Sequence, residues 1–182
     1  MHTDGDATAG DGKGGDAGAA EPPPPPGTAR ERLLAHLLDA LSAEPVQLCW
    51  LDPDFVHWPL NDARLLEALR RWGAPQRRLR LLALDFEPLR QAHPRFLRWR
   101  QLHEHLVVAR QLPEEARREL GQGAMPLALA LGSGPAVWQL WDWRRGPERL
   151  SLDPANHRAR QQWFDAISQR SAESFASTTL GL

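Results

Sequence analysis

The stretch that decides the predicted fold is Arg77–Arg110, RRLRLLALDFEPLRQAHPRFLRWRQLHEHLVVAR. Its apolar run Leu79–Leu84 predicts one strand, and the shorter run Leu106–Ala109 predicts another. Between the two strands, Pro88 suits the first turn of a helix, and His93-Pro94 should interrupt that helix. A strand, a helical crossover and a second strand are typical of a parallel pair in an α/β sheet.

Outward from this stretch, helical and strand-like patterns alternate along the chain. A capping box at Thr28 and Glu31 opens the first helix, and Asp153-Pro154 opens the last one. The further predicted elements are helices at 28–43, 62–73 and 153–170, a strand at 46–51, a polar loop at 142–152, and strands at 127–131 and 136–141 that form a β-hairpin. The predicted fold class is therefore α/β, with a mixed, mostly parallel sheet, helices on both faces and a C-terminal β-hairpin.

Three segments divide the chain. Residues 1–27 are mainly Gly, Ala and Asp and end in a run of prolines, so they predict a disordered, acidic and Pro-rich tail. Residues 28–170 predict one α/β domain, and residues 171–182 predict a frayed C-terminal tail. The N-terminal tail lacks the apolar region of a signal peptide, no run of about 18 apolar residues follows, and the lone Cys49 fits a buried thiol in a reducing compartment. These features predict a cytoplasmic protein with no membrane contact.

The net charge of −1 hides an asymmetry between the two ends of the chain. Residues 1–29 carry a net charge of −4, whereas residues 64–110 contain eleven Arg and four acids, a net charge of +7. Such a basic segment is typical either of a surface for an anionic partner, for which the acidic tail would compete, or of a solvated Arg-rich face. Lys13 is the single lysine, so the predicted domain has no residue for Schiff-base chemistry or for a P-loop lysine.

Two acids directly follow predicted strands, Asp52 after the first and Asp85 after the second. Because ligands of open α/β sheets lie at the carboxyl ends of the strands, Asp52 and Asp85 are candidate ligand-binding residues, with turns or helix caps as the structural alternative. His103 and His105 are a second candidate pair, but a spacing of two does not suit a metal pair on a helix. We expect no metal and no cofactor. One hypothesis for the four residues is an Asp- and His-dependent hydrolase or phosphotransferase.

Arg95, Arg98 and Arg100 surround Trp99 in the central stretch. In nucleic-acid surfaces, guanidinium groups meet phosphates and an aromatic ring stacks on a base. At helical spacing, however, Trp99 falls in line with Phe96, which predicts a place in the core. The segment therefore indicates either nucleic-acid or anion binding or an ordinary solvated helix.

The chain from about Ala29 to Arg170 resembles a single half of the phospholipase D-like fold, and more closely the uncharacterised bacterial phospholipase D-like domains. The order of the elements carries this resemblance, together with the segments Val46–Asp54 (VQLCWLDPD), Leu65–Gly73, Arg78–Leu84 and Leu106–Ala109, the late hairpin and Trp163-Phe164 in the last helix.

The catalytic motif of that family is missing. Active members carry His-x-Lys-x4-Asp on a late strand, whose equivalent here is Met125–Gly134. With Ser133 at the position of the Asp, Pro126 stands where the His belongs and Ala128 where the Lys belongs. The resemblance thus implies a degenerate, non-catalytic accessory or binding domain. Because active relatives pair two halves, it also implies a homodimer, with an anionic ligand or a protein as a further partner.

Overall fold

The computed structural model of the protein describes residues 27–119, 126–132, 134, 136–140, 143 and 148–175, without the side chains of residues 117–119. Residues 1–26 of the predicted disordered tail lie outside these described residues, as do Ser133 and Pro135 of the predicted hairpin turn. None of the helices in the described ranges combines the length and the apolar character that crossing a membrane requires.

The predicted helices and strands are confirmed, each within a few residues of its predicted ends. In chain order the elements are α1 Ala29–Ser42, β1 Gln47–Leu51, α2 Ala63–Trp72, β2 Arg78–Ala83, α3 Glu87–Ala92, α4 Pro94–Leu102, the short 3₁₀ helix η1 Glu104–Leu106, β3 Val107–Gln111, α5 Glu114–Glu119, β4 Leu127–Leu131, β5 Val137–Leu140, β6 Glu148–Ser151, α6 Pro154–Gln169 and β7 Ala172–Glu173.

The strands form one mixed sheet in the order β6-β5-β4-β1-β2-β3-β7. β1 and β2, and β2 and β3, pair in parallel, whereas β1–β4, β4–β5, β5–β6 and β3–β7 are antiparallel. The prediction of a mostly parallel sheet is therefore wrong. The parallel strands are the three joined by helical crossovers. In the described part of the chain no helix separates β4 from β5 or β5 from β6, and these neighbours pair antiparallel. β6 falls in the predicted polar loop, because an edge strand of sequence ERLS shows no apolar run.

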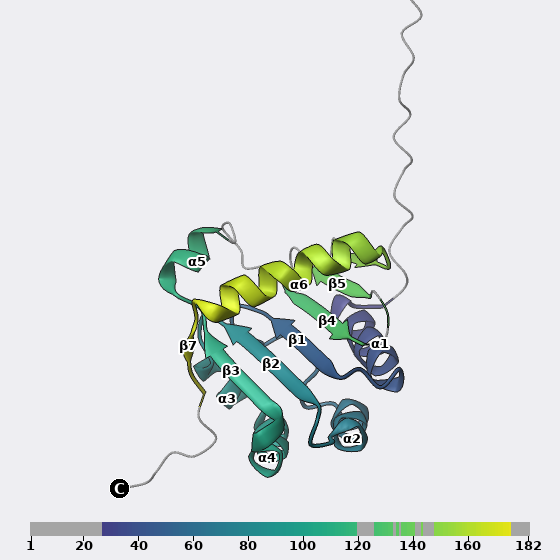
Figure 1. The fold of residues 1–182 in the computed structure, drawn as a ribbon. Coiled ribbons are helices and arrows are strands. Elements are labelled where there is room, and N and C mark those ends of the chain that lie inside the picture. The colour runs from purple at the N-terminus through teal and green to yellow at the C-terminus, as the bar shows by residue number, and fades with distance from the viewer. Residues whose placement is uncertain are drawn as a thin grey trace, which may run out of the picture.

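Helices cover both faces of the sheet, as predicted. Figure 1 shows α6 across one face and α1, α2 and α4 on the other. In β1, Leu48 and Trp50 join the core under α1 and α2, while Cys49 and Leu51 join the core under α6. A strand buried on both faces is apolar throughout, which explains why the sequence of β1 is a continuous apolar run.

Residues 171–175 continue the fold beyond the predicted domain boundary. β7 pairs with the end of β3 through Arg110 and Gln111. Phe175 is 4% exposed and stacks on Phe86 with ring centroids 4.7 Å apart. The first part of the predicted frayed tail is thus ordered, because it buries an aromatic ring, and residues 176–182 lie outside the described residues.

Local signals place the two helices that carry the candidate site. The Asp62 carboxylate caps α2 by accepting a hydrogen bond of 2.9 Å from the backbone N–H of Arg64. His93 separates α3 from α4, and Pro94 opens α4, as the sequence predicts. α2 follows β1 and α4 follows β2 as crossovers of two neighbouring parallel strands, so the two helices lie in contact on one face of the sheet.

Candidate functional site

The Arg-rich segment 64–110 does not form one continuous basic surface. Arg77 forms an ion pair of 3.1 Å with Glu44, and Arg80 pairs with Asp165 of α6. Arg110 donates to the backbone carbonyls of Ser168 and Ser171 at the end of α6. These arginines tie elements of the fold together, so the segment's charge of +7 overstates what a partner can reach.

Arg100 and Trp99 belong to the interior, so the candidate anion-binding residue Arg100 is not on the surface. The Arg100 side chain is buried, donates to the carbonyl of Phe175 and lies with its Cζ 4.1 Å from the centre of the Phe175 ring. Burial lowers the pKa of Arg100 to about 10, with a smaller contribution from Arg90. Trp99 is 2% exposed and stacks between Phe96 and His103, so the core alternative for Trp99 holds.

Five arginines on the outer sides of α2 and α4 remain exposed, and we call them the arginine face. They are Arg64, Arg70 and Arg71 on α2, and Arg95 and Arg98 on α4. With the buried Arg100, the two helices contain six arginines and one acid, Glu67, a net charge of +5, and α4 contains no acid at all. On this part of the surface, positive charge therefore exceeds the carboxylates that could neutralise it.

Ion pairs within the arginine face leave two guanidinium groups without a carboxylate. Arg64 pairs with Asp62 at 3.1 Å, and Arg70 pairs with Glu67 at 3.2 Å. Arg95 donates to the backbone carbonyl of Asn61 at 3.2 Å, which links the start of α4 to the loop before α2. Arg71 and Arg98 have no carboxylate partner within the described ranges. These two side chains, one on each helix, are the best placed to meet an external anion.

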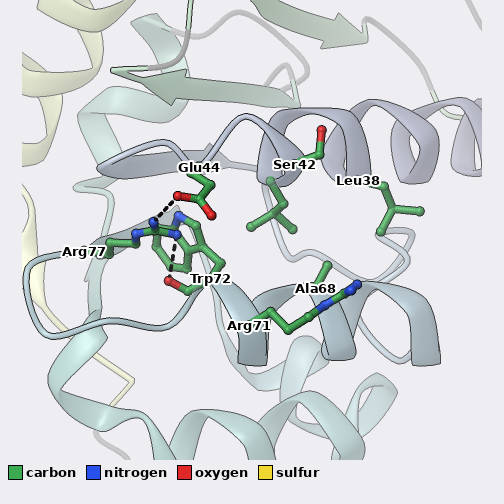
Figure 2. Close-up of a pocket in the computed structure, with 8 residues that line it drawn as sticks. Leu38, Ser42, Glu44, Ala68, Arg71, Trp72 and Arg77 are labelled. Carbon is green, nitrogen blue, oxygen red and sulfur yellow. Dashed lines mark hydrogen bonds and ion pairs between the residues drawn. The ribbon is translucent and has the colours of Figure 1, made fainter.

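A hollow of about 320 Å³ opens beside Arg71, between the C-terminal ends of α1 and α2. Figure 2 shows Arg77 beside Glu44 and Trp72 at one end of this hollow, and Arg71 projecting from α2. Arg77 is held on both sides, because it pairs with Glu44 and donates to the carbonyl of Trp72 at 3.0 Å. Arg71 is therefore the cation of this hollow that can still meet a ligand.

The predicted ligand residue Asp52 has a structural role at the end of β1. Its buried carboxylate accepts hydrogen bonds from the backbone N–H groups of Asp54 (3.0 Å) and Phe55 (2.7 Å) and from the indole N–H groups of Trp58 (2.9 Å) and Trp143 (3.4 Å). Burial raises the pKa of Asp52 to about 6, although the hydrogen bonds act in the opposite direction. Four protein donors occupy the carboxylate, so the turn alternative describes Asp52 better than ligand binding.

Asp85, His103 and His105 do not join Asp52 in a common site. Asp85 is exposed and accepts from the backbone N–H of Glu87 at 2.9 Å, which is the helix-start role that the sequence offered as an alternative. His103 donates through Nδ1 to the carbonyl of Trp99 at 2.8 Å, and His105 is exposed.

The sheet register separates the acids from the histidines. Both aspartates follow the carboxyl ends of β1 and β2, whereas η1, which contains His105, precedes β3 and lies next to the start of β2. Since β2 contains six residues, the two ends of the sheet are about 20 Å apart. Within the described residues no group of three His, Cys, Asp or Glu side chains could hold a metal ion. The arrangement required for the hydrolase hypothesis is therefore not formed.

Cys49 and His57, whose thiol and imidazole are the groups of a nucleophilic dyad, do not form such a pair either. Cys49 is buried, and burial raises the pKa of its thiol to about 11. His57 is exposed, with its ring 5.7 Å from that of Trp143.

The candidates drawn from the sequence did not include the arginines of α2. Arg64 and Arg71 are seven residues apart and lie on the side of α2 opposite to its buried residues Leu65, Leu66, Leu69 and Trp72. That helical spacing was visible in the sequence. The neighbourhood of α2 and α4 was not, because it depends on the order of β1 and β2 in the sheet.

The sequence matches no protein-family model and no curated protein. Among solved structures, the fold is similar to that of TrmBL2, described as an archaeal chromatin protein that shows a novel mode of DNA binding. The TM-score is 0.55 at 12% sequence identity, and the match covers 81% of this chain and 52% of the other, so this chain spans about half the length of TrmBL2. At this identity, the likeness concerns the fold alone.

Proposed function

We propose that this chain is a non-catalytic binding module that holds nucleic acid by its phosphates through the arginine face of α2 and α4. The observation that carries the proposal is the pair Arg71 and Arg98, which lie exposed on neighbouring helices without a carboxylate partner among the described residues. Guanidinium groups in this state gain charge-assisted hydrogen bonds from phosphate oxygens and give up no existing ion pair.

Phosphate contact without base stacking is the mode of binding that this surface supports. The aromatic residues of α2 and α4, which are Trp72, Phe96 and Trp99, are all buried, so neither helix offers a ring to a base. Contacts limited to the phosphates carry no sequence information, and they weaken steeply as the salt concentration rises. We therefore expect binding that is independent of sequence and sensitive to salt.

The likeness to TrmBL2 supports the proposal at the level of the fold, because that protein is described as binding DNA. The match covers 52% of that protein, so its description as a chromatin protein is not carried over to this chain.

We include the resemblance to phospholipase D-like domains in the same proposal. Pro126 and Ala128, which occupy the motif positions of the His and Lys, lie next to and within β4, and both are apolar. A phosphodiesterase-like scaffold that lacks its catalytic pair and keeps arginines for anions fits a binding role. The hydrolase alternative lacks a comparable observation.

Fluorescence anisotropy with a labelled DNA duplex of random sequence tests the proposal. We expect the double variant Arg71→Gln/Arg98→Gln to bind about tenfold more weakly at low salt, and the slope of log K against log salt to fall by about 1 for each phosphate that is no longer neutralised. The matched control is Arg149→Gln/Arg158→Gln, which removes the same charge from exposed positions on β6 and α6. The control should keep its affinity and slope.

Two outcomes would contradict the proposal. Equal weakening in both double variants would show that net charge alone drives the association. Absence of binding by the natural protein at low salt would leave the arginine face as an ordinary solvated surface.

A further inference from the structure

An apolar groove of about 710 Å³ lies between α1 and the β5–β6 edge of the sheet. Its apolar lining comes from Leu34 and Leu38 of α1, Trp138 of β5 and Leu150 of β6. Leu150 is 55% exposed, one of the few large apolar side chains on the described surface with that exposure. The groove shares Leu38 with the hollow beside Arg71, and Arg64 is the one residue of the arginine face among its lining residues.

An ion pair joins the two walls of the groove, α1 and β6. Arg32 of α1 forms an ion pair of 2.6 Å with Glu148 of β6, and both side chains are largely buried, with 13% and 11% exposure. β6 is in turn paired with β5 along its whole length. The groove is therefore a preformed feature of the fold, and filling it requires no opening of the core.

The described part of the chain begins at the mouth of this groove. Gly27 is one of the lining residues, and its φ of +108° lets the backbone turn where an L side chain would be strained. Arg32 donates to the carbonyl of Gly27, and the Thr28–Glu31 capping box holds the next residues. The chain outside the described residues thus ends at a fixed point beside the apolar lining, and the five residues before Gly27 are Pro22–Pro26.

We propose that Pro22–Pro26 docks in this groove as a polyproline II segment that lies antiparallel to α1. The lengths agree, because five residues of polyproline II span about 15 Å and the lining from Glu31 to Asp39 along α1 spans about 12 Å. The chemistry agrees as well, since proline rings are apolar and uncharged, and polyproline II segments are recognised in grooves lined by aromatic and apolar side chains. The segment is stiff before it binds, so little entropy is lost when it docks.

The attachment at Gly27 favours this segment over a separate partner. A short connection keeps the prolines at a millimolar effective concentration next to the groove, so even a weak contact is occupied. A consequence for the surface follows. Arg64 lies near Glu31 at the start of α1, so prolines docked antiparallel to α1 would carry Glu21 past Asp39, toward the end of α1 and the hollow beside Arg71. The docking itself does not depend on the proposed nucleic-acid binding.

The experiment compares the natural chain with a full-length variant in which Pro22–Pro26 is replaced by Gly-Ser-Gly-Ser-Gly. A synthetic peptide of residues 21–26 is titrated into each protein, and the backbone amide signals of Leu38 and Leu150 are followed by NMR. We expect the peptide to bind the Gly-Ser variant and to bind the natural chain about tenfold or more weakly, because the attached segment already fills the groove. The amide shifts of the saturated variant should match those of the natural chain without peptide.

A groove variant, Leu150→Glu in the Gly-Ser background, should lose peptide binding while keeping its urea midpoint, since Leu150 lies on an edge strand and is more than half exposed. The proposal is overturned if the Gly-Ser variant does not bind the peptide, if both proteins bind it equally, or if Leu150→Glu leaves binding unchanged. Amide shifts of the natural chain that change on dilution would assign the groove to a second copy and would also overturn the proposal.

Discussion

At the scale of the residue, two aspartates at equivalent positions in the sheet differ in burial. Asp52 and Asp85 each follow a parallel strand, yet Asp52 is 1% exposed and Asp85 lies in solvent. The difference lies in what surrounds them. Trp58 and Trp143 enclose Asp52 and donate to it, whereas Asp85 meets the first turn of α3 through one backbone hydrogen bond. Asp52 thus stabilises the loop that leaves β1 by accepting hydrogen bonds from the buried donors of Phe55 and Trp58.

Replacing Asp52 by Ala should lower the free energy of unfolding by about 2–4 kcal/mol, because the backbone N–H of Phe55 and the indole N–H of Trp58 would stay buried without an acceptor. Urea denaturation followed by tryptophan fluorescence measures this difference. The matched control is Asp85→Ala, which removes one exposed hydrogen bond and should cost less than about 1 kcal/mol. Equal losses in the two variants would refute the structural role of Asp52.

At the scale of the element, the last described residues pack against α3 and α4 and so hold the C-terminal end of the described chain on the sheet. Phe175 stacks on Phe86, and the guanidinium groups of Arg90 and Arg100 lie over its ring at 4.8 Å and 4.1 Å. β7 itself contributes two paired residues, so the burial of one aromatic ring holds the strand in place.

Removing the Phe175 ring tests whether this packing stabilises the fold. Phe175→Ala should lower the free energy of unfolding by about 3 kcal/mol, since a fully packed aromatic side chain is removed and a cavity is left beside Phe86. Hydrogen exchange should report the same change locally, as faster exchange of the Ser174 amide, which donates to the Ala109 carbonyl. Glu173→Gln, whose side chain is 85% exposed, serves as the control. An unchanged urea midpoint for Phe175→Ala would show that residues 171–175 are dispensable.

These elements also explain which predictions the sequence could support. Capped amphipathic helices and two-face-buried strands carry their signals locally, so α1, α2, β1, β2 and α6 were predictable. β6 and β7 are short, polar edge strands that depend on a neighbour for their pairing. The burial of Arg100 depends on Phe175, seventy-five residues later in the chain, and no local pattern announces such a contact.

At the scale of the whole molecule, two partly or fully buried titratable groups respond to acid with opposite signs. Burial raises the pKa of Asp52 to about 6 and lowers the pKa of His36 on α1 to about 4. For Asp52, the folded state binds the proton more tightly than the unfolded state, so stability increases as the pH falls from about 6 toward 4. For His36, the unfolded state binds the proton more tightly, so stability is lost as the pH falls from about 6.5 to 4.

Because the two windows overlap, single substitutions should reveal changes that partly cancel in the natural protein. Urea denaturation at about pH 7 and about pH 4 compares the natural protein with His36→Gln and with Asp52→Asn. On acidification, His36→Gln should gain about 3 kcal/mol relative to the natural protein, because its neutral side chain has no proton to take up on unfolding. Asp52→Asn should lose about 2 kcal/mol relative to the natural protein, because the carboxyl group that protonates favourably in the fold is gone. The sign of each change in the free energy of unfolding decides the test. If that free energy changed with pH in the same way for all three proteins, burial would shift the pKa of neither side chain.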